Sequence, residues 1–209
     1  MLHKRCFIDF DRTLYDTNKM NQIIFADLIS MGYLPSHIMG MYALLIPNGY
    51  SFEKHLSLLG HPISDIAKKV SEYENILSQG DTFLFPGVTQ RLNDLIFVAQ
   101  TYLLTHGYPP HQRKKFENVS TLRGAWTGLH YTWNDQTKGD IIQSYGSGVF
   151  ETWFIDDQPA YLLDVQQKAP WAECIRIMWP NSGAAPHPAD NRRWPVVTNF
   201  SDFVTLVES

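Results

Sequence analysis

Four short, strand-like runs that alternate with helical segments constrain the fold of this chain most strongly. The runs are mostly apolar and span residues 6–10, 101–104, 149–155 and 174–178. A further strand with an aromatic bias is expected at 126–133, and a shorter one at 196–197. Between them, apolar residues recur at helical spacing, and residues 110–118 are expected to form an exposed helix. Strands that alternate with helices form a mostly parallel sheet with helices on both faces. The sequence therefore predicts a doubly wound, Rossmann-like α/β fold.

The segment between the first two runs differs from the rest, because it holds helical patterns and no strand. We expect Ser51 and Ser64 to cap the third and fourth helices of this segment. The pattern predicts an α/β core with an inserted helical unit. The expected boundaries are residues 1–14 and 85–209 for the core and 15–84 for the insertion.

The composition indicates a folded, soluble protein of one or two domains. The chain has 209 residues, of which 44% are hydrophobic and 18% charged, so a sizeable core is available. Its net charge of −4 argues against nucleic acid or an anionic membrane as a partner. No run approaches the ~18 apolar residues of a membrane span, and no secretory leader is expected, because the first apolar run breaks at Asp9. We expect a cytoplasmic protein in which Cys6 and Cys174 are buried free thiols.

A pair of carboxylates lies at the end of the first run. Asp9 and Asp11 stand two residues apart, and Thr13 follows at the same spacing. Side chains alternate along a strand, but the chain begins to turn at the strand's tip, so both carboxylates can reach one site. There, two carboxylates can hold a divalent cation, and one can attack an electrophile while the other shuttles a proton.

Polar residues also follow the other runs, at the strand ends where a doubly wound sheet binds its ligands. They are Thr105, His106 and Gly107 after the second run, Asp156 and Asp157 after the third, and Lys138 at the start of the preceding helix. A glycine-containing turn between strand and helix presents N–H groups and a positive helix dipole to an anion. Carboxylates alone would repel a phosphate, and Mg²⁺ reverses that repulsion. The set predicts metal-assisted phosphoryl chemistry.

These segments resemble the four signature motifs of the haloacid dehalogenase superfamily of phosphohydrolases. The motifs are Asp9 to Leu14, Tyr102 to Thr105 with Gly107, the helix that begins at Lys138, and Phe154 to Asp157. The segment Leu14 to Thr17, which leaves the first motif, and Pro86-Gly87, where the chain would re-enter the core, resemble those of members with a helical C1-type cap inserted after the first strand. The sequence departs from the family pattern at Arg12, which is often glycine there, and at His106, which is often asparagine.

The resemblance implies a nucleophile, an acid and a metal site. Asp9 would attack the substrate and form an aspartyl-phosphate, and Asp11 would act as general acid and base. Both would also bind Mg²⁺, Asp11 through its backbone carbonyl. Asp157 would complete the metal site, with Asp156 as a further ligand or as support. Because the two aspartates are adjacent, the motif does not tell which of them binds the metal directly.

The resemblance also implies a phosphate site. Thr105 and nearby backbone N–H groups would hold the transferring phosphoryl group, and Lys138 would neutralise both Asp9 and the phosphate. Thr13 would support the turn beside the phosphate. His106 and Gly107 lie in the second phosphate-binding turn, where His106 is expected to be a loop residue and not a catalyst.

The expected function is Mg²⁺-dependent hydrolysis of a small phosphorylated metabolite. A phosphosugar, a nucleoside monophosphate and a phosphoglycolate-like acid all remain open as substrates. One alternative is a carbon–halogen hydrolase of the same superfamily, although Asp11 argues against it, because a departing halide needs no proton. The other alternative is a non-catalytic regulatory or binding protein that retains the fold.

Overall fold

The chain divides into two compact units, which are described separately below. The computed structural model describes residues 3–180, 182, 185–190 and 192–209. The α/β unit comprises Met1–Asp16, Leu84–His106 and Thr121–Ser209, and the helical unit comprises Thr17–Phe83 and Gly107–Ser120. Residues 107–120, expected within the core, thus group with the helical segment.

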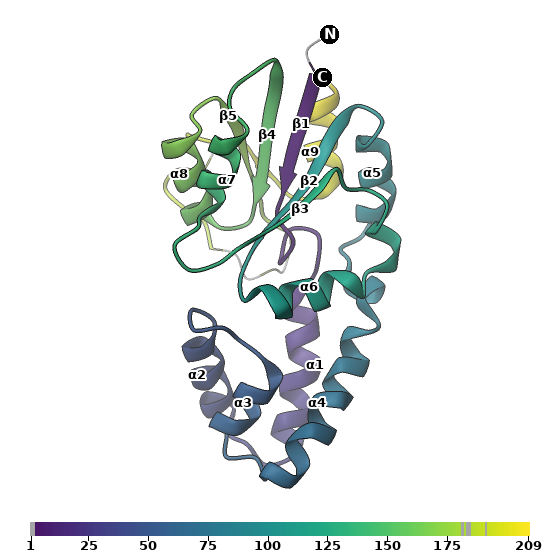
Figure 1. Ribbon diagram of the computed structural model, residues 1–209, viewed down its shortest axis with the longest axis vertical. Helices are drawn as coiled ribbons and strands as arrows, with labels where there is room; N and C mark the ends of the chain where they lie inside the picture. The colour runs from purple at the N-terminus through teal and green to yellow at the C-terminus, as the bar shows by residue number, and fades with distance from the viewer. Residues whose placement is uncertain (1–2, 181, 183–184, 191) are drawn as a thin grey trace. The chain divides into compact units, whose positions relative to one another are not determined.

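The α/β unit is built on a parallel sheet of six strands (Figure 1). The strands are β1 (His3–Ile8), β2 (Ala99–His106), β3 (Gly128–Thr132), β4 (Phe150–Asp156), β5 (Ala172–Ile177) and β6 (Val196–Val197). Their order across the sheet is β3-β2-β1-β4-β5-β6, and every neighbouring pair is parallel. The central position of β1, with β2 on one side and β4 on the other, confirms the predicted doubly wound architecture.

The strand register aligns apolar side chains into rows that cross the sheet. Phe7 pairs with Tyr102 of β2 and with Phe154 of β4, and Phe154 pairs with Cys174 of β5. All four side chains belong to one buried cluster. The residue that follows each of these in its strand, such as Ile8 in β1, belongs to a row on the other face of the sheet, because successive side chains point to opposite faces.

Helices cover both faces of this sheet (Figure 1). They are α5 (Val88–Leu95), α7 (Lys138–Ser144), α8 (Pro159–Lys168) and α9 (Phe200–Glu208). Ile142 of α7 with Leu162 and Val165 of α8 join the cluster that contains Phe7. Helices α5 and α9 pack together, and α9 also contacts β6. The apolar positions of each helix therefore close the core on the two sides of the sheet.

Both cysteines lie on buried strands as free thiols, as the sequence predicts. Burial raises the pKa of Cys6 far above its usual value, and burial together with the charge of Glu173 raises the pKa of Cys174 to about 12. The thiolate, which is the reactive form, is therefore scarce at neutral pH.

The helical unit has an aromatic core. Its helices are α1 (Thr17–Ser30), α2 (Pro35–Leu45), α3 (Phe52–Leu58), α4 (Ile63–Leu77) and α6 (Pro109–Glu117), with a 3-10 turn, η1, at Gly80–Phe83. The ring of Phe52 meets those of Tyr50, Tyr73 and His111 edge to face, at centroid separations of 5.3 to 5.8 Å. Such contacts explain why α6 groups with this unit.

Two local predictions about the helical unit need correction. Ser51 caps α3 as expected, since its side chain accepts a hydrogen bond from the Lys54 N–H. Ser64 does not cap α4, because that helix begins at Ile63, after Pro62. The helix expected to be exposed at residues 110–118 buries Gln112, Lys115 and Phe116. The polar sequence predicted exposure, but one face of the helix packs against the unit, because long polar side chains can bury their aliphatic parts.

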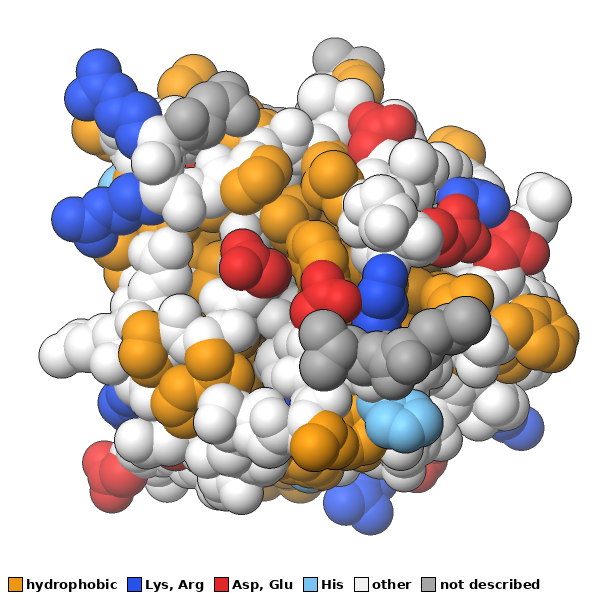
Figure 2. Space-filling model, turned by 90° about the horizontal axis from the view of Figure 1, so that it is seen from above, with side chains coloured by type: hydrophobic (Ala, Val, Ile, Leu, Met, Phe, Trp, Pro, Cys, Tyr) orange, Lys and Arg blue, Asp and Glu red, His pale blue; other side chains and the backbone are white. Residues whose placement is uncertain are grey.

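The described surface carries mixed charge on the face seen from above. Figure 2 shows Lys and Arg side chains interspersed there with Asp, Glu and apolar side chains, without one continuous basic surface. None of the helices in the described residues combines the length and apolarity that crossing a membrane requires.

The row through Phe154 predicts a strong dependence of stability on that side chain. Phe154 is fully buried at the centre of the sheet. Phe154→Ala should lower the free energy of unfolding by about 3–5 kcal/mol, because it leaves a cavity under α7 and α8. Urea denaturation measures the change. Phe97, which is 85% exposed, provides the matched control: Phe97→Ala should change stability by less than about 0.5 kcal/mol. Equal effects of the two variants would contradict this account of the core.

Candidate active site

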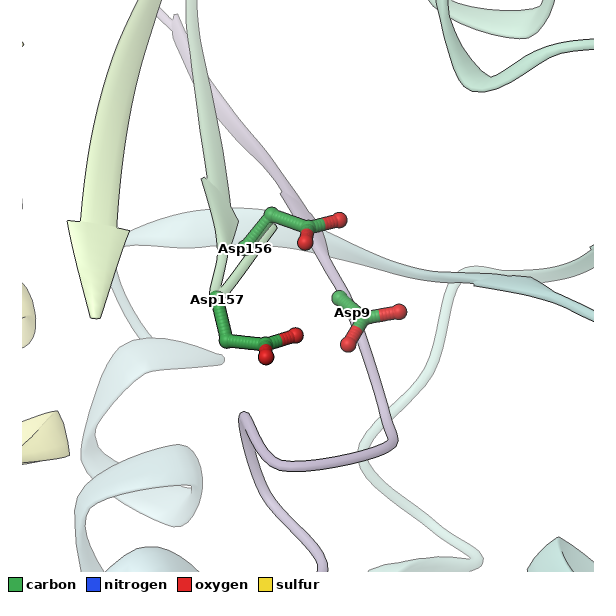
Figure 3. Close-up of side chains that lie close together, drawn as sticks. All are labelled: Asp9, Asp156 and Asp157. Atoms are coloured by element: carbon green, nitrogen blue, oxygen red, sulfur yellow. The ribbon is translucent and has the colours of Figure 1, made fainter. Parts of the chain in front are cut away.

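Three buried carboxylates meet where β1 and β4 end. Asp9 directly follows β1, and its N–H donates to the Ile155 carbonyl at 3.1 Å, which continues the register of the two strands. Asp156 ends β4, and Asp157 follows it. Ligand oxygens of the three side chains lie within 4.8 Å of one another (Figure 3). The parallel register thus brings together aspartates nearly 150 residues apart in sequence.

Lys138 holds two of these carboxylates. Its Nζ lies 2.5 Å from Asp9 Oδ1 and 2.6 Å from Asp156 Oδ2, and its side chain is completely buried. A capping box formed by Thr137 and Asp140 sets the start of α7, so that Lys138 is the first residue of the helix. An internal ammonium group between two carboxylates stabilises the charges that burial disfavours.

Asp156 and Asp157 have different partners. Asp156 uses one oxygen for Lys138 and the other for the backbone N–H of Gln158, at 2.7 Å. Asp157 Oδ2 accepts from the Gln158 side-chain amide at 2.6 Å and pairs with Arg12 Nε at 3.2 Å. Asp156 is therefore bound on both oxygens by groups of the core, whereas Asp157 faces the half-exposed Arg12.

Burial disfavours the charged forms of all three acids. It raises the pKa of Asp9 to about 7 and those of Asp156 and Asp157 to about 6, although Lys138 and Arg12 oppose the shift. Burial lowers the pKa of Lys138, but the charges of Asp156 and Asp9 outweigh it, and the net shift is upward. Clustered carboxylates with raised pKa values favour binding of a further cation, and an all-oxygen donor set suits Mg²⁺.

The turn after Asp9 is tight. The N–H groups of Thr13, Leu14 and Tyr15 all point at the Phe10 carbonyl, at 3.0 to 3.3 Å. Arg12 adopts a left-handed conformation with φ of 62°. The Asp11 carboxylate is not part of the three-acid cluster, but its charge contributes to the raised pKa of Asp9.

Two threonine hydroxyls near the strand ends are buried without a hydrogen-bond partner among the described residues. They belong to Thr13 and to Thr105, which lies near the end of β2. The Thr13 N–H donates to the Phe10 carbonyl within the turn, and its carbonyl accepts from Trp179 Nε1 at 3.0 Å. A buried hydroxyl without a partner is costly, and an anion at the site could accept its proton.

His106 and Gly107 are at the end of β2 and just after it. His106 Nδ1 hydrogen-bonds the Thr132 hydroxyl at 3.0 Å, and burial, followed by the charge of Lys138, lowers the pKa of its imidazole. His106 is therefore a neutral residue that is anchored to β3. Gly107 belongs to the helical unit, where its φ of 143° favours glycine and a Cβ would displace the Gln112 side chain, whose Nε2 lies 2.5 Å from that position.

Sequence reasoning did not find several residues that surround the carboxylates. Gln158 binds both Asp156 and Asp157, the Tyr161 ring centre lies 4.5 Å from Lys138 Nζ, and Arg176 Nε donates to the Asp157 carbonyl at 3.4 Å. The position of Tyr161 one helical turn after the aspartate pair could have indicated it. Arg176 belongs to another strand, and no local signal points to it.

A surface cavity of about 520 Å³ lies elsewhere on the α/β unit. Its lining includes Asp16, Phe85, Trp179 and Asn199, and none of the three clustered carboxylates. We place the candidate site at the carboxylates, because catalysis depends on the arrangement of reactive groups, and the three clustered acids and Lys138 are not part of this cavity.

The fold built on the six-stranded parallel sheet matches known structures. No family model matches the sequence, and no curated protein is similar to it in sequence. By structure, the chain is similar to a haloacid dehalogenase-like family hydrolase from Xanthomonas campestris, with 17% identity, a TM-score of 0.70 and coverage of 99% of this chain and 95% of that one. This chain has the haloacid dehalogenase-like fold.

Two further structures with this fold differ in what they bind. The putative hydrolase YfnB from Bacillus subtilis, bound to magnesium, is 12% identical, with a TM-score of 0.67 and full coverage of both chains. The L-2-haloacid dehalogenase from Xanthobacter autotrophicus, with chloropropionic acid covalently bound, is 13% identical, with a TM-score of 0.63 and coverage of 100% of this chain and 99% of that one. The haloacid dehalogenase-like fold therefore does not by itself distinguish the phosphoryl from the halide chemistry.

The raised pKa values predict a link between pH, Mg²⁺ and stability. Folded carboxylates with raised pKa values hold protons that the unfolded chain has released, so metal-free stability should fall as pH rises from about 4 to 7. Because Mg²⁺ binds the deprotonated acids, it should raise the melting temperature more at about pH 8 than at about pH 5. Scanning calorimetry with EDTA or excess Mg²⁺ measures this. Asp157→Asn is the comparison, and an equal Mg²⁺ effect in that variant would contradict a metal site at Asp157.

Proposed function

We propose that this protein is a Mg²⁺-dependent phosphohydrolase that acts on a small phosphorylated metabolite. The observation that carries the proposal is the Asp9 carboxylate, which is buried, bound by Lys138 and clustered with Asp156 and Asp157. A nucleophilic carboxylate requires an anionic form in a buried site, a fixed orientation and a neighbouring cation. Lys138 supplies the orientation and one positive charge.

The donor groups fit a magnesium ion. Asp9, Asp157 and the Asp11 backbone carbonyl would hold it, and Asp156 would support the site through Lys138 and Gln158. Bound Mg²⁺ supplies positive charge that neutralises the carboxylates and polarises the phosphoryl group. The partners of Asp156 support Asp157 as the direct ligand, since both Asp156 oxygens are already bound by Lys138 and Gln158 N–H.

In the first chemical step, Asp9 attacks the phosphorus atom. A new bond forms between a carboxylate oxygen and phosphorus, and the bond from phosphorus to the leaving oxygen breaks. Asp11 gives its proton to that oxygen. Thr105, whose hydroxyl has no protein partner among the described residues, donates to a phosphoryl oxygen, and Lys138 keeps Asp9 in place.

In the second step, water releases the phosphate. Asp11, now a carboxylate, takes a proton from the attacking water as the water oxygen bonds to phosphorus. The bond between phosphorus and Asp9 breaks, and the Asp9 carboxylate is regenerated. The helical unit is proposed to act as the cap that selects the substrate. A reducing, cytoplasmic setting suits the two free thiols.

Halide release is the competing function, because a dehalogenase shares the fold. Both reactions would use Asp9 as a nucleophile. The difference is the leaving group, since a departing alkoxide needs the proton of Asp11 and a halide does not. Purified protein should therefore hydrolyse an aryl phosphate with Mg²⁺ and lose that activity with EDTA. Halide release from a 2-haloacid without phosphatase activity would overturn the proposal. If phosphatase activity is found, a screen of phosphorylated metabolites identifies the substrate class.

Asp9→Asn tests the nucleophile. The amide has the same shape as the carboxylate but is a poor nucleophile and a weaker metal ligand, so turnover should fall by several orders of magnitude. Steady-state kinetics with an aryl phosphate and circular dichroism measure activity and folding. Asp94→Asn, which changes a partly exposed acid on α5, should keep wild-type turnover. Near-normal activity of folded Asp9→Asn would contradict the mechanism.

Asp11→Asn tests the general acid and base. This variant cannot protonate the leaving oxygen or accept the water proton, so turnover should fall by roughly two to four orders of magnitude. With an activated aryl phosphate the first step needs little acid, and phosphate should accumulate on Asp9. Mass spectrometry after acid quench detects the added phosphate. Wild-type rates with both good and poor leaving groups would show that Asp11 is only structural.

A further inference from the structure

Arg12 has an unfavourable backbone conformation beside the carboxylate cluster. Its φ of 62° lies in the left-handed region, which side chains with a Cβ rarely adopt. The turn enforces this conformation, because the Arg12 N–H donates to the Tyr15 carbonyl at 2.7 Å. An asparagine or glycine would fit this position with less strain. The arginine therefore needs an explanation from its side chain.

The Arg12 side chain supplies a positive charge to Asp157. Its Nε lies 3.2 Å from Asp157 Oδ2, and the two side chains are 40% and 7% exposed, respectively. The Gln158 amide donates to the same oxygen at 2.6 Å. Asp157 thus keeps one orienting partner even without Arg12, so the guanidinium is not required to hold this carboxylate in position.

The two cations of the cluster differ in how they are held. Lys138 is completely buried between Asp9 and Asp156. Among the acids of the cluster, the Arg12 side chain pairs with the outer one, Asp157, and much of its side chain is exposed to solvent. A long, partly exposed side chain can change partners at little free-energy cost, whereas a buried ion pair cannot.

We propose that Arg12 competes with Mg²⁺ for the negative charge of Asp157 and, when Mg²⁺ is bound, interacts with an anionic oxygen of the substrate. This inference rests on the proposed function. A positive charge within contact distance of Asp157 weakens the binding of a second cation there. The same guanidinium, relieved of its carboxylate, is suited to phosphate or carboxylate oxygens.

The proposal requires opposite effects of one substitution. Arg12→Gln keeps a polar side chain that can donate hydrogen bonds, although a shorter one, and removes its charge. Mg²⁺ should bind about three- to tenfold more tightly, because the competing charge is gone. Inorganic phosphate, measured with Mg²⁺ saturating, should bind about tenfold more weakly, because an anion partner is lost. A residue that only supports the fold or orients Asp157 would weaken both.

Isothermal titration calorimetry of the full chain measures both affinities. Arg12→Lys, which keeps the charge, should retain an Mg²⁺ affinity close to wild type. Arg91→Gln is the matched control for net charge, since Arg91 pairs with Asp94 and Glu208 away from the cluster, and it should change neither affinity. Thermal melting confirms that each variant is folded.

The outcomes separate this inference from the proposed function. If wild type binds Mg²⁺ and Asp157→Asn does not, but Arg12→Gln binds Mg²⁺ no more tightly than wild type, the inference is overturned and the proposed function stands. Unchanged phosphate affinity in Arg12→Gln also overturns it. If wild type neither binds Mg²⁺ nor hydrolyses an aryl phosphate, the proposed function fails, and this inference fails with it.

Discussion

The parallel pairing of β1 with β4 is the constraint on which the rest of the site depends. Because Ile8 pairs with Ile155, the residues that follow, Asp9 and Asp156, end at the same edge of the sheet. Three carboxylates within 4.8 Å and almost without solvent would repel one another strongly. The fold tolerates them because Lys138 enters between Asp9 and Asp156 from the first turn of α7.

This arrangement leaves the site short of positive charge and rich in unused hydrogen-bonding groups. Three carboxylates face two cations, Lys138 and the half-exposed Arg12. The buried hydroxyls of Thr13 and Thr105 have no partner in the described residues. Such groups destabilise a folded protein in isolation, and they are retained at sites that bind a cation and an anion together. The same features that reduce stability are those that the proposed phosphoryl transfer would use.

Sequence reasoning predicted the parallel sheet correctly, because the sheet follows from the periodicity of apolar residues. It failed where polarity was a poor guide to burial. Lys115 is buried in α6, although its polar sequence predicted an exposed helix, and Ser64 does not cap α4 because Pro62 already sets the start of that helix. Backbone geometry and the packing of side-chain stems decide such details, and neither is visible in hydropathy.

The alternation of strands with helices and the acids at the strand ends were therefore determined by the sequence alone, since a strand's end exposes whatever residues come next. Only the tertiary structure decided that Lys138 joins Asp9 to Asp156, that Gln158 and Arg12 share one oxygen of Asp157, and that Arg176 supports the Asp157 backbone. These contacts join residues far apart in the chain. They depend on strand register, helix position and side-chain rotamer together, and no local pattern encodes that combination.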